Sequence, residues 1–227
     1  MATTNDSAPN VFGLLNRTSD SLKAKNKENI AGFEISLIKK IADKLNLELE
    51  INVLDFEGVL AALNQEKIDV AITCMSITEE RSKKLDHSKA YIQAQTSMIV
   101  RRNDKRFEGL IQKEEINFEG FCDELKKIAT PNEPIQFVTF QNTAAIPVIK
   151  KIVAQTNMQE SQPLVKKNNE LSSPPACFQD VSQKKSDIFV IDSFMARWAC
   201  ASDNNLAFFN MNSKNLSHSA CPQGVFV

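Results

Sequence analysis

The fold of this chain is decided by one stretch, residues 67–86, which reads KIDVAITCMSITEERSKKLD. Residues 69–73 form a short, almost continuously apolar run, which is typical of a parallel strand that helices cover on both faces. A segment with hydroxyl, carboxylate and guanidinium side chains follows at residues 75–81. Open α/β sheets bind their ligands beyond the carboxyl ends of the strands, so this order predicts a strand that leads into a ligand site.

Strands and helices alternate in the sequence before this stretch. Apolar residues recur at helical spacing from Leu37 to Leu45, which predicts an amphipathic helix after Gly32-Phe33. The order strand, helix, strand, helix, strand indicates an α/β lobe with right-handed crossovers. The other predicted elements of this lobe are strands at residues 11–15 and 47–54 and a helix at residues 59–63.

A second α/β pattern follows the strand predicted at residues 97–100. The charge-rich residues 101–106 are interpreted as a crossing between lobes, and the polar residues 159–175 as a long surface loop. The predicted elements of this second pattern are strands at residues 136–140, 188–191 and 206–209, and helices at residues 144–154, 177–183 and 193–201.

Composition excludes several classes of protein. The 227 residues are 42% hydrophobic and 24% charged with a net charge of −1, so nothing in the charge balance indicates a nucleic-acid partner. No apolar stretch approaches the ~20 residues of a membrane span, and residues 1–10 lack the pattern of a signal peptide, so we expect any export signal to have been removed. Five cysteines without CxxC spacing and two histidines predict no metal site and no cofactor, and they leave a Cys200–Cys221 disulfide open.

Polar residues also follow the other predicted strands. Asn16 comes after the first strand, Asp55 and Phe56 after the second, and Asp192 after the strand at residues 188–191. Gln141-Asn142-Thr143-Ala144 lies between a strand and a helix of the second pattern. Each place satisfies the rule for ligand sites in open α/β sheets, and together they predict the candidate site.

Four ordered blocks resemble the bacterial extracellular solute-binding proteins that serve polar amino-acid ABC transporters. The blocks are GFEISL at residues 32–37, DFEGVLAAL at residues 55–63, KIDVAIT at residues 67–73 and MSITEERSKKLD at residues 75–86. From residue 106 onward the similarity is limited to the turn after Gln141 and to SDIFVID at residues 186–192. The resemblance implies a two-lobed, periplasmic-binding-protein-like clamshell of α/β class, with each lobe a sheet flanked by helices and the ligand in the cleft between them.

The resemblance also assigns roles to the residues that match the family's blocks. Arg81 is expected to hold the ligand α-carboxylate, because a guanidinium fork matches the two oxygens of a carboxylate. Asp192 is expected to pair with the α-ammonium. The other expected ligand-binding residues are Ser76, the backbone at Cys74, Thr143 with the amide of Ala144, Phe56 over the aliphatic part of the ligand, and Asn16.

Each of these residues also has a purely structural interpretation. Arg81 lies in a Glu- and Lys-rich turn where a solvated helix residue is common, and Phe56 suits a hydrophobic core. Thr143 and Asp192 are both good helix N-caps. These alternatives stay open from the sequence alone.

The chain departs from the family pattern at three places. No aromatic residue lies near Ser19, which favours a polar or small neutral amino acid over a cationic one. Asn142 stands where the family has a glycine, and asparagine tolerates a positive φ better than most residues. The chain also stops where the family continues with further helices; a shorter gene product, removal of part of the chain and a second polypeptide that completes the first lobe all remain open.

The predicted first lobe is residues 1–102 plus 222–227, and the second is residues 103–221. The implied partners are an amino acid and a membrane ABC permease, outside the cytoplasmic membrane, in the periplasm or on a lipid anchor. The expected protein is a binder and no enzyme. Its rivals on the same scaffold are a cyclohexadienyl dehydratase, with Glu57 and His87 as the nearby acid–base candidates, and the ligand-binding domain of a membrane sensor or receptor.

Overall fold

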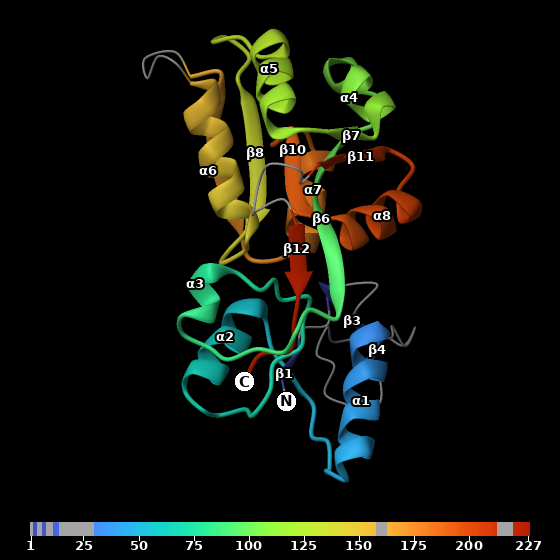
Figure 1. Cartoon of the computed structure of the whole chain (residues 1–227). Coiled ribbons are helices and arrows are strands. Elements are labelled where there is room, and N and C mark those ends of the chain that lie inside the picture. Colours follow the sequence, from blue (N-terminus) through green and yellow to red (C-terminus); the bar gives the residue numbers. More distant parts are fainter. Residues whose placement is uncertain (1, 4–5, 8–10, 14–29, 158–162, 213–219) are drawn as a thin grey trace. The chain divides into compact units, whose positions relative to one another are not determined.

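The computed structural model describes residues 2–3, 6–7, 11–13, 30–157, 163–212 and 220–227. Contacts divide the chain into two compact units (Figure 1). Unit 1 is Met1–Ile92 with Pro222–Val227, and unit 2 is Gln93–Cys221. The first boundary therefore falls at Ile92, before the predicted boundary at residue 102, because the strand that begins there belongs almost entirely to the sheet of unit 2.

Unit 2 is built on one mixed sheet whose order is β7-β11-β6-β10-β8-β9. The long strand β6 (Ile92–Arg101) pairs antiparallel with β10 (Ile188–Asp192) and β11 (Leu206–Met211). β10 and β9 (Val165–Leu171) pair parallel with β8 (Ile135–Phe140), and β7 (Glu115–Ile116) pairs parallel with β11. β12 (Ala220–Gln223) also pairs with β6. The parallel strands β8 and β10 thus bring their carboxyl ends to one edge of the sheet.

Helices cover both faces of this sheet, and the alternation of side chains along each strand explains why. Met98 and Val100 pack into one core with α4 (Glu108–Lys113), α5 (Phe118–Ile128) and α6 (Ala145–Thr156). Ile99, between them, packs into a second core with α7 (Pro174–Ser182) and α8 (Ser193–Ser202). A strand buried on both faces shows a continuous apolar run, as residues 98–100 of β6 and 188–191 of β10 do. The predicted α/β class is confirmed.

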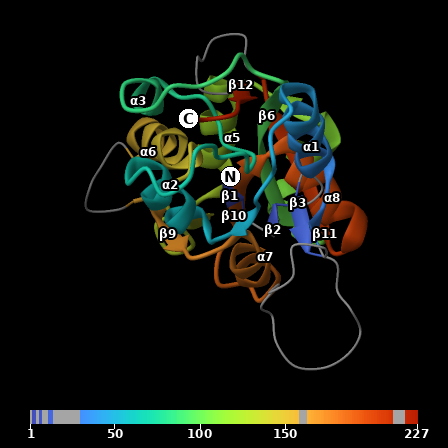
Figure 2. The same cartoon turned by 90° about the horizontal axis from the view of Figure 1, so that it is seen from below.

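Unit 1 contains two small sheets and three helices among its described residues. β1 (Ala2–Thr3) pairs parallel with β5 (Asn52–Val53), and β2 (Asp6–Ser7), β3 (Val11–Gly13) and β4 (Ile30–Ala31) form an antiparallel sheet. Both views place α1 (Phe33–Leu45) and α2 (Phe56–Asn64) on opposite sides of β1 (Figures 1 and 2). Each helix buries its apolar stripe in its own core, with Ile72 on the side of α1 and Ala71 on the side of α2.

The predicted strand at residues 69–73 is wrong as a regular parallel strand. Ala71, Ile72 and Thr73 are buried, but the backbone makes a single antiparallel bridge, between Ala71 and Phe226. Each of these two residues donates its amide to the carbonyl of the other, at 2.9 and 3.0 Å. These residues are therefore apolar because they are buried on both sides, and not because they form a strand. The predicted strand at residues 47–54 is likewise reduced to Asn52–Val53, and Leu47 is exposed.

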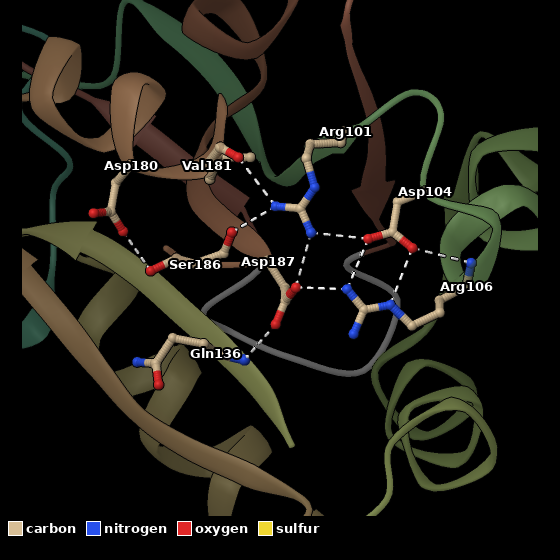
Figure 3. A network of polar contacts seen from close by, with 8 residues as sticks. All are labelled: Arg101, Asp104, Arg106, Gln136, Asp180, Val181, Ser186 and Asp187. Atoms are coloured by element: carbon tan, nitrogen blue, oxygen red, sulfur yellow. Dashed lines mark hydrogen bonds and ion pairs between the residues drawn. The ribbon is translucent and has the colours of Figure 1, made fainter. Parts of the chain in front are cut away.

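The sequence predicted that residues 101–106 cross between the two units. In the structure these residues lie within unit 2. Arg101 and Arg106 share the carboxylates of Asp104 and Asp187 in a closed network inside unit 2 (Figure 3). All four contacts measure 2.6–2.9 Å, and the Arg101 side chain is only 9% exposed. Asp187 also accepts the amide of Gln136 at 2.9 Å, which ties the start of β10 to the start of β8. A run of charges here marks a buried ionic cluster.

Two further differences follow from weak or mixed sequence signals. The polar residues 159–175, predicted as a loop, contain β9, an outer strand of the sheet that carries Lys, Asn and Glu residues. The helices α4 and α5 were not predicted, although α5 carries a buried apolar stripe of Phe121, Cys122 and Leu125. In the described part of the chain, no helix has the length and apolar character of a membrane span.

Candidate functional site

Arg81 is held in one orientation by two contacts inside unit 1. It lies in α3 (Glu79–Ser82), a short helix capped by Thr78, whose Oγ1 accepts the Arg81 amide at 3.2 Å. Nη1 of Arg81 donates to the carbonyl of Ser76 at 2.8 Å, and the guanidinium carbon lies 5.5 Å from the centroid of the Phe56 ring. A cation stacked on an aromatic face and tied to a carbonyl has a fixed plane. A fixed guanidinium plane is what a bidentate grip on a carboxylate requires.

Phe56 packs against a core, as one of its two interpretations expects, and it also contacts Arg81. It is the first residue of α2, it packs partly buried against the core of that helix, and its ring faces Arg81. Asp55, just before it, caps α2 by accepting the Gly58 amide at 2.6 Å.

The backbone between Cys74 and Ser76 makes a sharp turn that the rest of unit 1 holds in place. Cys74 has a φ of 52°, the left-handed conformation that most side chains avoid. Its amide donates to Oε1 of Glu34 at 2.8 Å. On the other side, Ser76 bridges to Gln223, and the Ile77 amide donates to the Pro222 carbonyl at 2.7 Å. The residues expected to bind ligand are therefore braced by α1 and by the last segment of the chain.

Thr143 and Ala144 lie at the start of α6 in unit 2. Oγ1 of Thr143 accepts the Ala145 amide at 2.8 Å and lies 3.4 Å from Oγ1 of Thr139. Ala144 is the N-cap residue of the helix. Asn142 has a φ of 60°, so it takes the left-handed conformation that asparagine tolerates better than most residues. Thr143, one residue before the N-cap, thus accepts the first amide of the helix, at a place that also suits a negative ligand group.

Asp192 is the N-cap of α8 and ends β10. Its Oδ1 accepts the amides of Phe194 and Met195 at 2.9 and 3.1 Å. Burial raises the pKa of the Asp192 carboxyl, and the two amide hydrogen bonds oppose this rise only in part. Thr139 and Val190, one on each of the paired strands β8 and β10, are linked by a 3.1 Å hydrogen bond. Asp192 and Thr143 therefore follow neighbouring strand ends on one edge of the sheet.

The candidate residues form two groups. Phe56, Cys74, Ser76 and Arg81 lie together in unit 1, while Thr143, Ala144 and Asp192 lie at one sheet edge in unit 2. Asn16 lies outside the described residues. Of the acid–base candidates, Glu57 is exposed, and the ring of the exposed His87 contacts Ser82 Oγ at 2.9 Å and the Ser88 carbonyl at 2.8 Å.

Cysteines and metal ligands add no further site among the described residues. Cys74, Cys122, Cys177 and Cys200 are free thiols there, so Cys200 forms no disulfide. Burial raises the pKa of Cys122 and Cys200 to about 11 and that of Cys177 to about 12, so these thiols stay protonated at neutral pH. The described part of the chain holds no group of three or more His, Cys, Asp or Glu side chains suited to a metal ion.

A family model matches most of the chain. The model of the bacterial extracellular solute-binding proteins, family 3, covers residues 16–199. The chain belongs to this family. The matched range includes every residue that the sequence analysis singled out for ligand binding.

Curated relatives of this family 3 protein match over shorter stretches. The arginine-binding extracellular protein ArtP of Bacillus subtilis is 35% identical over 38% of this chain and 33% of its own length. The glutamine-binding protein of Geobacillus stearothermophilus is 31% identical over 42% of this chain and 35% of its own length. The L-cystine-binding protein TcyJ of Escherichia coli is 30% identical over 34% and 29%. The match spans about a third of the length of these relatives.

Solved structures agree with the fold over the whole chain. An amino-acid ABC transporter substrate-binding protein of Streptococcus pneumoniae, bound to L-arginine, has a TM-score of 0.74 at 21% identity, covering all of this chain and 79% of that one. The arginine-bound, truncated ArgBP of T. maritima has a TM-score of 0.70 at 22% identity, covering all of this chain and 85% of that one. At these identities the likeness establishes the two-lobed fold alone.

Sequence reasoning missed Glu34 as part of this site. Its side chain is fully buried, and it lies on the apolar stripe of α1 with Ile38 one turn later. A carboxylate at helical spacing with core residues was the available signal, because a solvated helix acid lies on the opposite face. Its place in the first turn of α1 made it resemble an ordinary N-terminal acid.

Proposed function

We propose that this chain binds one free amino acid, without chemical conversion, and presents it to an amino-acid ABC permease outside the cytoplasmic membrane. The observation that carries the proposal is the fixed guanidinium of Arg81, held between the Ser76 carbonyl and the Phe56 ring. A fixed fork of N–H donors favours a carboxylate over a neutral ligand. Membership of family 3, with arginine-, glutamine- and cystine-binding relatives, supports an amino acid as the owner of that carboxylate.

Each group of residues has a proposed role toward an amino acid. Arg81, with Ser76, the backbone at Cys74 and Phe56, serves the α-carboxylate and the neighbouring carbons. Asp192 serves the α-ammonium, and Thr143 with the Ala144 amide adds a further donor set at the start of α6. A zwitterion that leaves water loses hydration at both charged ends, so each end needs a charged or polar partner.

The proposal predicts a specific response in a thermal-shift screen of the purified protein against the twenty amino acids. At least one L-amino acid, at 100-fold over its dissociation constant, is expected to add ~2.7 kcal/mol and to raise the melting temperature by roughly 5–11 °C. The screen includes arginine, glutamine and cystine, and it also settles whether the missing aromatic wall near Ser19 excludes cationic side chains.

The same screen carries its own controls. Sugars, dipeptides and divalent metal ions are expected to leave the melting temperature unchanged. Response to sugars or metals alone would refute the proposal. Incubation with prephenate and arogenate, with aromatic product as the readout, separates binding from dehydratase chemistry; turnover of either compound contradicts a purely binding role.

Replacing Asp192 by asparagine is expected to weaken the binding of that amino acid about tenfold, because a charged acceptor contributes more to a hydrogen bond than a neutral one. Asparagine keeps an oxygen for the Phe194 and Met195 amides, so the cap of α8 survives.

The same substitution should not destabilise the empty protein. The raised pKa of Asp192 means that folding disfavours its ionised carboxylate, and this cost appears as pH rises above the ordinary value of 3.8. Asp192→Asn should therefore not lower the melting temperature of the empty protein at neutral pH. Calorimetric titration measures the affinity, and an unchanged value removes Asp192 from the site.

A further inference from the structure

Glu34 is a fully buried acid that accepts a hydrogen bond from the backbone just before the Arg81 segment. It lies in the first turn of α1, and its side chain has no exposed surface. Oε1 accepts the Cys74 amide at 2.8 Å and the hydroxyl of Tyr91, and Oε2 lies 4.0 Å from the Cys74 thiol. A carboxylate taken out of water needs such donors, and the first turn of a helix also favours its negative charge.

The bond to the Cys74 amide selects an uncommon backbone conformation. With a φ of 52°, Cys74 is in the left-handed region, which a residue with a Cβ occupies only when its surroundings require it. Glu34 supplies that requirement from one side. The carbonyl of Met75 supplies it from the other, by accepting the Gly224 amide at 3.2 Å.

The turn at Cys74 decides where the next carbonyls point. Met75 is completely buried, so the chain has little freedom between the turn and Ser76. The Ser76 carbonyl accepts Nη1 of Arg81 at 2.8 Å. Glu34 is thus connected to the guanidinium through two fixed backbone groups, the Cys74 amide and the Ser76 carbonyl.

We propose that Glu34 is the positioning residue of the amino-acid site, an inference that rests on the proposed function. Glu34 makes no contact with the ligand. It holds the left-handed turn at Cys74, and through the Ser76 carbonyl it fixes the plane in which Arg81 meets a carboxylate. The hydroxyl of Tyr91 braces the carboxylate of Glu34 in turn.

The proposed role of Glu34 depends more on the position of its acceptor oxygen than on its negative charge. The variants are chosen to separate these two properties. In Glu34→Gln the amide oxygen can still accept both the Cys74 amide and the Tyr91 hydroxyl, since both donate to the same atom, Oε1. In Glu34→Ala the acceptor of both bonds is lost. Glu34→Asp keeps the charge but withdraws it by one methylene from the Cys74 amide, which gives a second test in case the alanine variant fails to fold.

The experiment measures affinity by calorimetry for the amino acid that gives the largest thermal shift. We expect Glu34→Ala to bind at least tenfold more weakly, Glu34→Asp to lie between it and the wild type, and Glu34→Gln to stay within threefold of the wild type. Ile38→Ala is the matched control, because Ile38 is buried one turn further along α1 among apolar residues. It should lower the melting temperature but leave the affinity within twofold.

A double-mutant cycle with Arg81→Lys separates positioning from general loosening. If Glu34 acts through the guanidinium plane, adding Glu34→Ala to Arg81→Lys should change the affinity by less than threefold. An equal loss in both backgrounds overturns the inference, as does wild-type affinity in both Glu34→Ala and Glu34→Asp. A wild-type protein that binds no amino acid overturns the proposed function as well, so the two failures are distinguishable.

Discussion

Replacement of Arg81 by alanine is expected to lower the affinity for the amino-acid ligand by roughly 30- to 5000-fold, equivalent to ~2–5 kcal/mol. The reason is that the ligand carboxylate would lose its charged partner while it still pays the cost of leaving water. Arg81→Lys should lose much of the same affinity, because an ammonium has neither the planar fork nor the broad face that stacks on Phe56. Calorimetric titration of both variants measures the effect.

Two controls make the Arg81 result specific. Lys84→Ala removes a nearby cation whose side chain is 68% exposed and which pairs only loosely with Glu80, at 3.6 Å; its affinity should stay within twofold. The melting temperature of ligand-free Arg81→Ala should change little, because this side chain lies in the last turn of a four-residue helix with no buried residue. Affinity of Arg81→Ala within threefold of the wild type would take Arg81 out of the site.

Six helices and strands of unit 2 could be predicted from the sequence close to their observed ranges. β8, β10 and β11 and the helices α6, α7 and α8 all lie within a few residues of their predicted ranges. Each combines a period with a clear boundary, such as Asp192, which ends a strand and caps the next helix. β9 escaped prediction because an outer strand needs few apolar residues, and its Lys and Asn residues resemble a loop.

Unit 1 was harder to predict because some of its buried segments do not pair as regular strands. Residues 71–73 are as buried as any strand, yet their backbone pairing consists of one bridge to Phe226, more than 150 positions away. A local pattern reports which side chains are inside, but it does not report which backbone partner is present. The error at residues 101–106 has a similar cause, because Asp187, the partner that turns these charges into a buried cluster, lies far along the chain.

For the candidate site, the sequence suggested residues but not the contacts that support them. Arg81, Thr143 and Asp192 were proposed from their positions after predicted strands and from the family resemblance, and the structure places each beside a helix start or in a short helix. The brace formed by Glu34 and the last segment of the chain joins residues from three distant parts of unit 1. Such contacts follow from tertiary packing and leave only an indirect trace in the sequence, here a carboxylate on an apolar helix stripe.

Replacement of Asp187 by alanine is expected to destabilise the protein by about 3–5 kcal/mol and to lower the melting temperature by roughly 6–20 °C. Asp187 accepts bonds from Arg101 and Arg106 through Oδ1 and from the Gln136 amide through Oδ2 (Figure 3). Its loss leaves Arg101, only 9% exposed, with one carboxylate instead of two, and removes the acceptor of a backbone amide. Thermal and urea unfolding of the ligand-free protein measure the change.

Asp123→Ala is the matched control, since it removes the same side chain from the same unit. Asp123 is 66% exposed and pairs with Lys126 at 3.4 Å, so its loss should cost less than about 1 kcal/mol. Equal effects in the two variants would contradict a special role for the buried cluster.

The pKa of Asp104 in the same cluster predicts how stability depends on pH. Burial opposes ionisation of Asp104, but hydrogen bonds and charge from Arg106, with a hydrogen bond from Arg101, outweigh this effect and lower the Asp104 pKa from 3.8 to about 2. A lowered pKa means that this contribution to stability is present above pH 3.8 and lost as pH falls toward 2, so Asp104→Asn should flatten the acid limb of the unfolding curve in that window. If the acid limb of Asp104→Asn is as steep as that of the wild type, the cluster does not govern stability in acid. The reason is that the cluster responds to pH through the protonation of Asp104, which weakens its pairing with Arg101 and Arg106.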